Sequence, residues 1–220
     1  MHQLWWVKPE TVEETPERLA LLTPEERAQH QRFIPPIKRH EYLVTRLLVK
    51  TVLGKSAAFI TNQWGRPELS PPSKLRFNIT HTEGLVALFL SDEHELGVDT
   101  ERISRAPRLL KLAPNVFAPA ELSDLAALPA DQQAHRALTL WTLKESYIKA
   151  RGMGLALALD GFAFRFDAHG TIRLEVEPRL SDDGARWQFQ TFTHGEHLIS
   201  TAIGSTLPLK IDLREAVLAP

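Results

Sequence analysis

Residues 77–101 read FNITHTEGLVALFLSDEHELGVDTE, and this stretch predicts the central sheet of the protein. Its first four residues are extended, and residues 85–90 are apolar on both faces, which is typical of a central strand. A polar turn over residues 91–95 leads into a third strand over residues 96–101. We therefore expect an antiparallel meander of three strands.

Helices are expected on both sides of this meander. A capping box formed by Thr23 and Glu26 begins a helix that ends near residue 33. Apolar periodicity predicts further helices over residues 39–53 and from residue 131 or 132 to residue 151, each followed by a glycine. Alternating apolar residues predict four later strands, at 162–166, 172–176, 187–192 and 197–203.

The order helix, helix, meander is followed by helix, meander, so the order of elements repeats once. We expect an α+β fold of two similar α+β halves, each a helix plus an antiparallel meander. A pseudo-twofold axis would relate the halves, with the active-site cleft between them. We assign residues 1–103 to the N-terminal half and residues 104–220 to the C-terminal half, which includes a connector over residues 104–130. Residues 62–75, with their Gly and Pro, are expected to be loop.

The composition excludes several classes of protein. The 220 residues include 26 Lys and Arg and 27 Asp and Glu, a net charge of −1 that argues against nucleic acid or an anionic membrane as partner. There is no cysteine, so a metal would be held by carboxylates, histidines or water. The N-terminus lacks the pattern of a signal peptide, and we expect a soluble cytoplasmic protein. Two halves in one chain favour a monomer.

Three carboxylates and a lysine are the first candidates for a functional site. Asp99 and Glu101 lie two residues apart on a strand, so they share a face, where their charges repel unless a cation is present. Glu145 and Lys149 lie one helical turn apart, with Glu145 expected at the edge of the core. Taken singly, the first pair is also typical of a strand entering a polar loop, and the second of an ion pair on a solvated helix.

Two further segments carry groups that suit an anion. Phe77-Asn78-Ile79-Thr80-His81-Thr82 ends a strand with a histidine between two hydroxyls. Gly65-Arg66-Pro67 is a rigid turn that presents one guanidinium. Singly, the first is also typical of a structural histidine and the second of a surface turn.

Together and in this order, these segments resemble the 4′-phosphopantetheinyl transferase superfamily. The resemblance rests on Gly97-Val98-Asp99-Thr100-Glu101 and on Trp141-Thr142-Leu143-Lys144-Glu145-Ser146-Tyr147-Ile148-Lys149, and it extends to the arginine turn and the histidine segment. It is similar in particular to the larger, pseudo-dimeric type that activates surfactin synthetase and other nonribosomal peptide synthetases. One departure is that Thr80 and Thr82 stand where the family has serines, which keeps the hydroxyls.

The resemblance implies a reaction and its site. The phosphopantetheine arm of coenzyme A would pass to a serine of an acyl or peptidyl carrier protein, with release of adenosine 3′,5′-bisphosphate. Asp99, Glu101 and Glu145 would hold Mg²⁺, with Mn²⁺ as a substitute. Glu101 would act as general base, directly or through a metal-bound water. Lys149 would stabilise the charge of the α-phosphate or protonate the leaving phosphate. The residues expected to bind coenzyme A are Arg66, His81, Thr80, Arg39, Lys144 and Lys149.

Two alternatives stay open from the residues. A Mg²⁺-dependent phosphodiesterase or nuclease would use the same three carboxylates, but the near-zero net charge argues against a nucleic-acid substrate. A non-catalytic module that binds carrier proteins would not need the carboxylates and the lysine together.

Carrier proteins present an acidic helix, so by analogy with the family the expected docking surface is the apolar and basic part of the connector. Its residues are Leu109, Leu110, Lys111, Val116 and Phe117, with core packing as the alternative for the last two.

Overall fold

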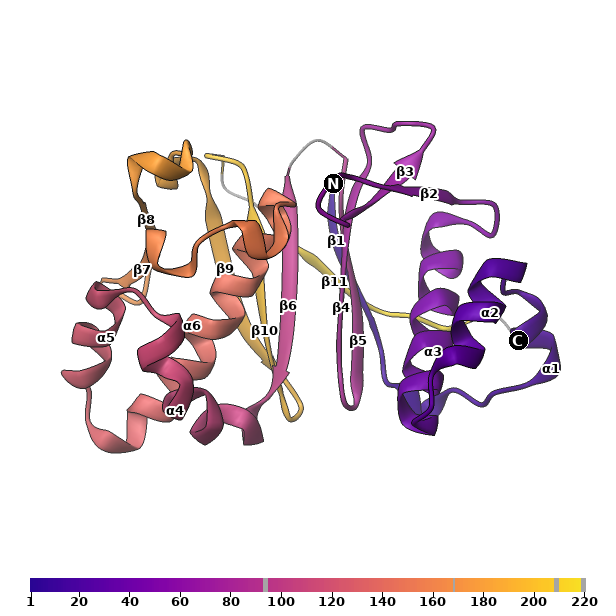
Figure 1. Ribbon diagram of the computed structural model, residues 1–220, viewed down its shortest axis with the longest axis horizontal. Coiled ribbons are helices and arrows are strands. Elements are labelled where there is room, and N and C mark those ends of the chain that lie inside the picture. The colour runs from indigo at the N-terminus through magenta and orange to yellow at the C-terminus, as the bar shows by residue number, and fades with distance from the viewer. Residues whose placement is uncertain (93–94, 168, 208–209, 219–220) are drawn as a thin grey trace.

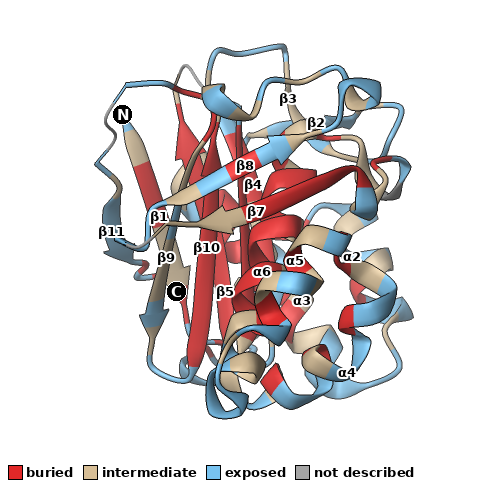
Figure 2. Ribbon diagram, turned by 90° about the vertical axis from the view of Figure 1, so that its left-hand side faces the viewer, coloured by how far each residue is buried: buried red, intermediate tan, exposed pale blue. Residues whose placement is uncertain are grey.

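The computed structural model describes residues 1–92, 95–167, 169–207 and 210–218. The first two strands of the expected meander are present as β4 (Arg76–Thr82) and β5 (Leu85–Ser91), an antiparallel pair. β5 is buried along its whole length because both of its faces are covered, as its apolar sequence indicates. Figure 2 shows the same burial along β10 and along the C-terminal part of α6.

The first sheet has the order β11-β1-β5-β4. β1 (His2–Val7) is antiparallel to β5, and β11 (Asp212–Glu215) is parallel to β1. Neither β1 nor β11 was expected from the sequence, because their few residues do not alternate clearly between apolar and polar. β11, from the C-terminal part of the chain, therefore forms an edge of this sheet and lies next to β1.

The third strand of the expected meander is paired elsewhere, so the prediction of a three-stranded meander was wrong. β6 (Leu96–Arg102) is antiparallel to β10 (His197–Ile203), which pairs with β9 (Gln188–His194), giving a second sheet of order β6-β10-β9. β6 forms its backbone ladder with β10 along its whole length. Towards β4 the N–H of Val98 donates to Asn78 Oδ1 at 2.9 Å, so β6 meets the first sheet through a side chain and not through a backbone ladder.

Three helices cover the first sheet on one side of the molecule in Figure 1. They are α1 (Pro16–Ala20), α2 (Pro24–Arg32) and α3 (Pro36–Leu53). The capping box at the start of α2 is confirmed, since Glu26 N donates to Thr23 Oγ1 and Thr23 N donates to Glu26 Oε2. α3 buries leucines and valines against β5 and thereby forms the core of this half.

The other half contains α4 (Ala106–Val116), α5 (Pro119–Ala126) and the long α6 (Ala130–Arg151). The expected connector is thus largely helical. β7 (Phe162–Phe166) and β8 (Ile172–Val176) form a separate antiparallel pair beside this half. Short 3₁₀ turns lie at Pro9–Thr11, Ile103–Arg105, Gly154–Ala156, Leu159–Gly161, Pro178–Leu180 and Gly184–Arg186.

Part of the region expected to be loop forms a hairpin. β2 (Ala58–Thr61) and β3 (Pro67–Ser70) pair antiparallel and place the Gly65-Arg66-Pro67 turn near the end of α6. The α+β fold with two α+β halves is confirmed, and Figure 1 shows the two groups of helices on opposite sides of the strands. The division at residue 103 stays a prediction, and strand pairing crosses it at β6 and again at β11. Within the described residues, no helix combines the length and the apolar composition that crossing a bilayer requires.

Candidate active site

Asp99 lies where the two halves meet. Its Oδ1 accepts a hydrogen bond from Lys149 Nζ at 2.7 Å and from Thr80 Oγ1 at 3.2 Å. These partners come from α6 and β4, so three elements converge on one carboxylate. Lys149 Nζ also donates to the carbonyl of Val98 at 3.2 Å, which holds the lysine beside β6.

A glycine allows this convergence. Gly97 on β6 lies so close to α6 that a Cβ atom built there would be 1.9 Å from the carbonyl oxygen of Ser146. Any side chain at this position would push the helix away from the strand. The Gly97-Val98-Asp99 segment therefore brings Glu145 and Lys149 of α6 close to Asp99.

The second oxygen of Asp99 is unsatisfied. Asp99 is 6% exposed, and its Oδ2 has no hydrogen-bond partner among the described residues. A buried charged oxygen without a partner is costly, so such a group favours a cation.

Glu101 lies on the same face of β6 as Asp99 and is 7% exposed. Burial raises the pKa of Glu101, and the negative charge of Asp99 raises it further, while the ion pair with Arg105 acts in the opposite direction. Arg105 lies in the 3₁₀ turn that follows β6, and its guanidinium forms an ion pair with the Glu101 carboxylate.

Glu145 completes the carboxylate group from the helix side. Burial raises its pKa, and the charges of Asp99 and Glu101 add to this effect, whereas Lys149 opposes it. The structure therefore brings together the three carboxylates and the lysine that the sequence singled out. Glu101 and Glu145 are both destabilised in their charged forms, mainly by burial and further by the neighbouring carboxylates.

The donor set suits a hard divalent cation. Carboxylate oxygens are the protein ligands that Mg²⁺ prefers, and the orphaned Asp99 Oδ2 and the mutual repulsion of the carboxylates fit such an ion. In the arrangement seen here, Lys149 and Arg105 bind two of the carboxylates. Across the described parts of the chain, no three His, Asp or Glu side chains are grouped tightly enough to hold a metal ion as they stand.

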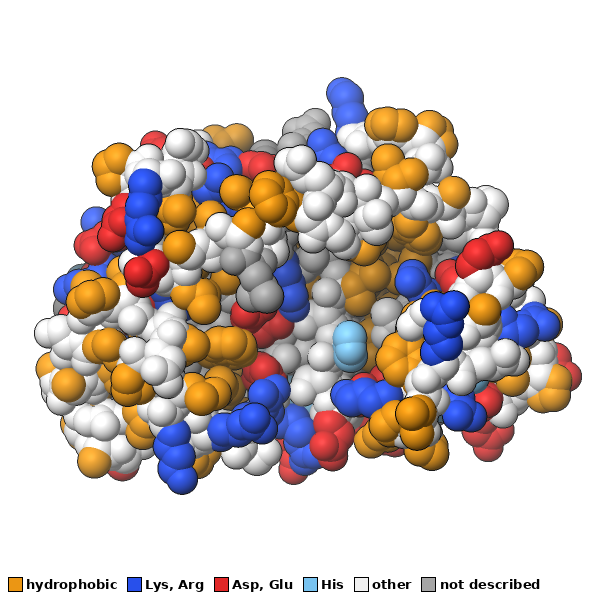
Figure 3. All heavy atoms as spheres, in the orientation of Figure 1, with side chains coloured by type: hydrophobic (Ala, Val, Ile, Leu, Met, Phe, Trp, Pro, Cys, Tyr) orange, Lys and Arg blue, Asp and Glu red, His pale blue; other side chains and the backbone are white. Residues whose placement is uncertain are grey.

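A cleft of about 320 Å³ opens next to the carboxylates. Its lining includes Arg66 and Trp64 from the β2–β3 turn and Glu145 and Lys149 from α6, so it lies between the halves. Arg66 Nη1 donates to the carbonyl of Ala150 at 2.9 Å, and its buried Nε has no partner among the described residues. In Figure 3 acidic and basic side chains gather along the hollow between the halves.

His81 is the next-to-last residue of β4 and does not line this cleft. The residue keeps an exposed surface, but protein surrounds the ring closely enough that desolvation lowers its pKa. Glu41 on α3 opposes this effect, and the charges of Lys38 and Lys149 strengthen it. The imidazole is therefore neutral at neutral pH and lies within electrostatic range of both halves.

Comparison with known proteins identifies the family. Residues 95–202 match the sequence model of the 4′-phosphopantetheinyl transferase superfamily. The chain is 30% identical over 183 residues to 4′-phosphopantetheinyl transferase Sfp of Bacillus subtilis strain 168, with 80% of each chain covered. The chain belongs to the 4′-phosphopantetheinyl transferase superfamily. A putative 4′-phosphopantetheinyl transferase of Synechocystis is also 30% identical, over 82% of this chain and 81% of that one.

Two further matches cover about half of the chain. The transferase AcpT of Escherichia coli K12 is 35% identical over 52% of this chain and 59% of its own. A holo-(acyl-carrier-protein) synthase of Bacillus anthracis, solved in complex with CoA (3′,5′-ADP), aligns with 50% of this chain and 93% of its own at 17% identity and a TM-score of 0.43. The match to Sfp over most of the chain confirms the resemblance to the larger type and the assignment to an enzyme class, the phosphopantetheinyl transferases.

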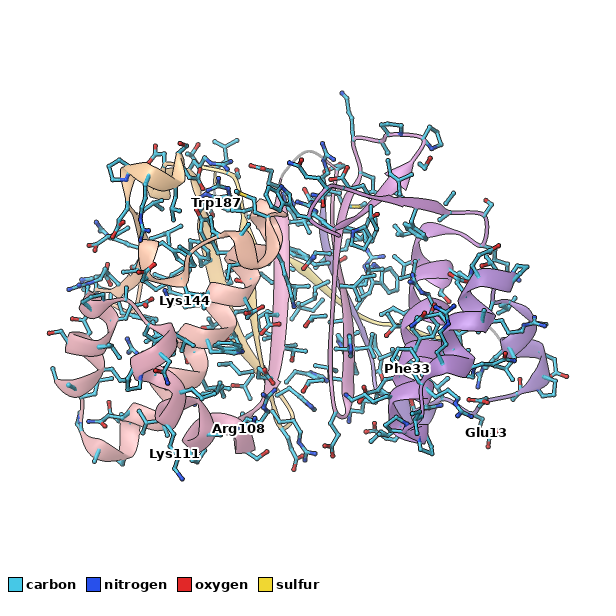
Figure 4. All side chains as sticks on the ribbon, in the orientation of Figure 1. Glu13, Phe33, Arg108, Lys111, Lys144 and Trp187 are labelled. Carbon is cyan, nitrogen blue, oxygen red and sulfur yellow. The ribbon has the colours of Figure 1, made fainter. Side chains whose placement is uncertain are left out.

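Two residues expected to bind coenzyme A in this transferase lie elsewhere. Lys144 is fully buried, pairs with Glu121 at 2.8 Å and donates to two backbone carbonyls, so no ligand reaches it; Figure 4 labels it on α6. Lys144 is adjacent to Glu145 in sequence, but adjacent helical residues point about 100° apart. Arg39 donates to the carbonyl of Phe33 and lines a different pocket, among α1, α2 and α3.

The sequence reasoning missed several residues of the transferase site. Asn78 fixes β6 beside β4, Arg105 pairs with Glu101, and Asn62 fastens the arginine turn. Asn78 lies inside the histidine segment, and Asn62 lies three residues before Gly65. Their position in or beside the motifs was the sequence feature that could have identified them as site residues. For Arg105 the signal was its spacing of four from Glu101, which becomes a contact because a 3₁₀ turn follows the strand.

Proposed function

We propose that the protein transfers the 4′-phosphopantetheine group of coenzyme A to a serine of an acyl or peptidyl carrier protein and releases adenosine 3′,5′-bisphosphate. The observation that carries this proposal is the convergence of Asp99, Glu145 and Lys149 beside a cleft that also contains Arg66. Anionic phosphates fit the basic side of this cleft, and a cation fits the acidic side. Membership of the transferase family supports the same reaction.

Asp99, Glu101 and Glu145 would hold the metal ion, Mg²⁺ or in its place Mn²⁺. When bound, such an ion neutralises the negative charge that collects on a breaking pyrophosphate. The Oδ2 of Asp99 supports this assignment, because it is buried and, among the described residues, has no hydrogen-bond partner, while Lys149 binds the other oxygen. Lys149 and Arg105 would then lose part of their present contacts with the carboxylates.

Glu101 would accept the proton of the carrier serine as the hydroxyl attacks the β-phosphate. Burial and Asp99 raise its pKa, which brings the carboxylate closer to the range in which a general base is effective. Lys149 lines the cleft with 27% of its side chain exposed, and it would donate to the leaving phosphate. Thr80 and His81 would bind phosphate from β4, whose residues Asn78 and Ile79 line the cleft, while Thr80 itself is buried and bonded to Asp99.

The carrier protein would dock on α4. Of the expected docking residues, Leu109 and Phe117 belong to the core at 1% and 4% exposure, so they are not available to a partner. Lys111 is exposed, and Arg108 and Leu112 lie beside it on the helix surface. Figure 4 labels Arg108 and Lys111 on the outer side of α4. A basic surface with an apolar centre complements an acidic carrier helix.

Mass spectrometry tests the reaction. Purified protein, Mg²⁺ and coenzyme A are incubated with a panel of acyl and peptidyl carrier proteins. We expect one carrier serine to gain about 340 Da, the mass of the transferred group. A folded protein that modifies no carrier of the panel would contradict the proposal. Appearance of the nucleotide product without carrier modification would favour a phosphodiesterase.

A further inference from the structure

The turn between β2 and β3 is fastened to the end of α6 by two side chains. Asn62 Nδ2 donates to the carbonyl of Gly152 at 2.9 Å, and Arg66 Nη1 donates to the carbonyl of Ala150 at 2.9 Å. The bonded residues are 90 and 84 positions apart in the chain. The hairpin of one half is thereby attached to the helix of the other half that carries Glu145 and Lys149.

Asn62 also builds the turn that carries Arg66. Its Oδ1 accepts from the N–H of Trp64 and from the N–H of Arg66, each at 2.9 Å. Its backbone N–H donates to the carbonyl of Arg66 at 3.0 Å. One amide side chain therefore shapes the turn with its oxygen and attaches the turn to α6 with its nitrogen.

The attachment point is chemically favourable. The last carbonyls of a helix have no partner within the helix, and a cation near them is stabilised by the helix dipole. The fit is also close. Gly152 has a left-handed backbone with φ of 65°, and a Cβ atom built there would be 2.7 Å from Cδ of Arg66. A small displacement of the turn would therefore open a gap between Arg66 and α6.

We propose that Asn62 is a positioning residue, which holds Arg66 over the end of α6 and so fixes the anion-binding end of the cleft between the halves. This inference rests on the proposed function, in which the cleft takes the phosphates of coenzyme A. Arg66, Glu145 and Lys149 line the same cleft, so the distance between the turn and the helix sets whether they engage one ligand together. Asn62 acts on the ligand only through this geometry.

Asn62→Asp separates the two tasks of the side chain. The aspartate keeps an acceptor for Trp64 N–H and Arg66 N–H, but it loses the donor and sets an oxygen against the carbonyl of Gly152. We expect the KM for coenzyme A to rise about tenfold, the size of a broken hydrogen bond that leaves an acceptor unpaired, with a smaller change in kcat. Asn62→Ala, which removes both tasks, should raise KM at least as much. The KM for the carrier protein should stay the same.

Gln63→Glu provides the matched control. It introduces the same negative charge one residue away, at an exposed position, and leaves the contacts of Asn62 in place. We expect a KM for coenzyme A within about twofold of that of the unchanged protein, a shift of the size left by screened surface charge. If Gln63→Glu and Asn62→Asp raise KM equally, charge is the cause and the inference is wrong.

A double-mutant cycle tests whether Asn62 acts through Arg66. Arg66→Ala removes the group that Asn62 positions, so Asn62→Asp should have no further effect on KM in that background. Effects that multiply would show that Asn62 acts independently of Arg66, which overturns the inference. Thermal unfolding of each variant separates a loss of fold from a loss of position.

Isothermal calorimetry with coenzyme A distinguishes this inference from the proposed function. If the unchanged protein neither binds coenzyme A nor modifies a carrier, the proposed function fails. If it does both, and Asn62→Asp and Asn62→Ala bind coenzyme A as tightly as the unchanged protein, only the role of Asn62 is refuted. Weaker binding in both variants, with normal unfolding temperatures, supports the positioning role.

Discussion

Replacing Lys144 by methionine removes one half of an ion pair whose two side chains are completely buried. Lys144 Nζ binds Glu121 Oε2 at 2.8 Å and donates to the carbonyls of Leu159 and Phe162, each at 2.8 Å. Methionine fills a similar volume but offers no donor. The Glu121 carboxylate would keep its bonds from two backbone N–H groups and lose its cation.

The size of the effect follows from this burial. Removing one partner of a buried ion pair costs about 3–5 kcal/mol of unfolding free energy, because the other charge is left uncompensated. For a chain of this length, each kcal/mol lowers the unfolding midpoint by about 2–4 °C, so we expect a drop of about 6–20 °C. The double variant Lys144→Met with Glu121→Gln removes both charges, and it should recover most of the lost stability.

Calorimetry or circular dichroism measures the midpoints of the three proteins, and a coenzyme A titration at a temperature where all are folded measures affinity. We expect Lys144→Met to lower the midpoint and to leave affinity close to that of the unchanged protein. Weaker coenzyme A binding with an unchanged midpoint would refute the structural role and restore the phosphate contact expected from the sequence. A double variant no more stable than the single one would refute the argument about uncompensated charge.

Four further predictions concern the cleft. Asp99→Asn and Glu145→Gln should each abolish carrier modification without lowering the unfolding midpoint, since each relieves repulsion between buried carboxylates; near-normal rates in either would argue against the carboxylate site. Lys149→Ala should lower kcat by about 10²–10³ with a smaller change in coenzyme A affinity, and equal effects on both would indicate a binding role instead. Chelation with EDTA should stop turnover and added Mg²⁺ should restore it, whereas turnover that survives chelation would exclude a metal requirement. Burial lowers the pKa of His81 in the free protein, and a bound phosphate would raise it. Binding therefore favours the protonated imidazole, and coenzyme A affinity should fall as pH rises from about 6 to 8. The same pH dependence of affinity in His81→Asn would assign the effect to another group.

Local patterns explain why much of the fold could be predicted. The capping box of Thr23 and Glu26, the apolar run of β5 and the glycine after α6 each act within a few residues, so the sequence alone indicates them. The pairing of β6 instead joins it to β10, a strand far away in the chain. The alternation of apolar and polar residues in β6 does not indicate its partner strand, because an antiparallel strand along either edge of β6 would leave the same face of β6 buried.

The same contrast applies to the candidate site. Asp99, Glu101, Glu145 and Lys149 were singled out because residue spacing on a strand and a helix already places them on common faces. Lys144 was assigned to the wrong environment, because its partner Glu121 is more than 20 positions away and lies on a helix that was expected to be a connector. Contacts of this range depend on the packing of α5 against α6, which periodicity does not encode.

The parallel pairing of β1 with β11 has a consequence for folding. One edge of β1 pairs with β5, whereas the strand that covers its other edge, β11, follows only about 200 residues after β1. Ala216 and Leu218, which follow β11, close the core against α3 and its neighbours at 7% and 8% exposure. An N-terminal half that folds before β11 is in place would therefore keep one edge of β1 unpaired and part of its apolar core uncovered.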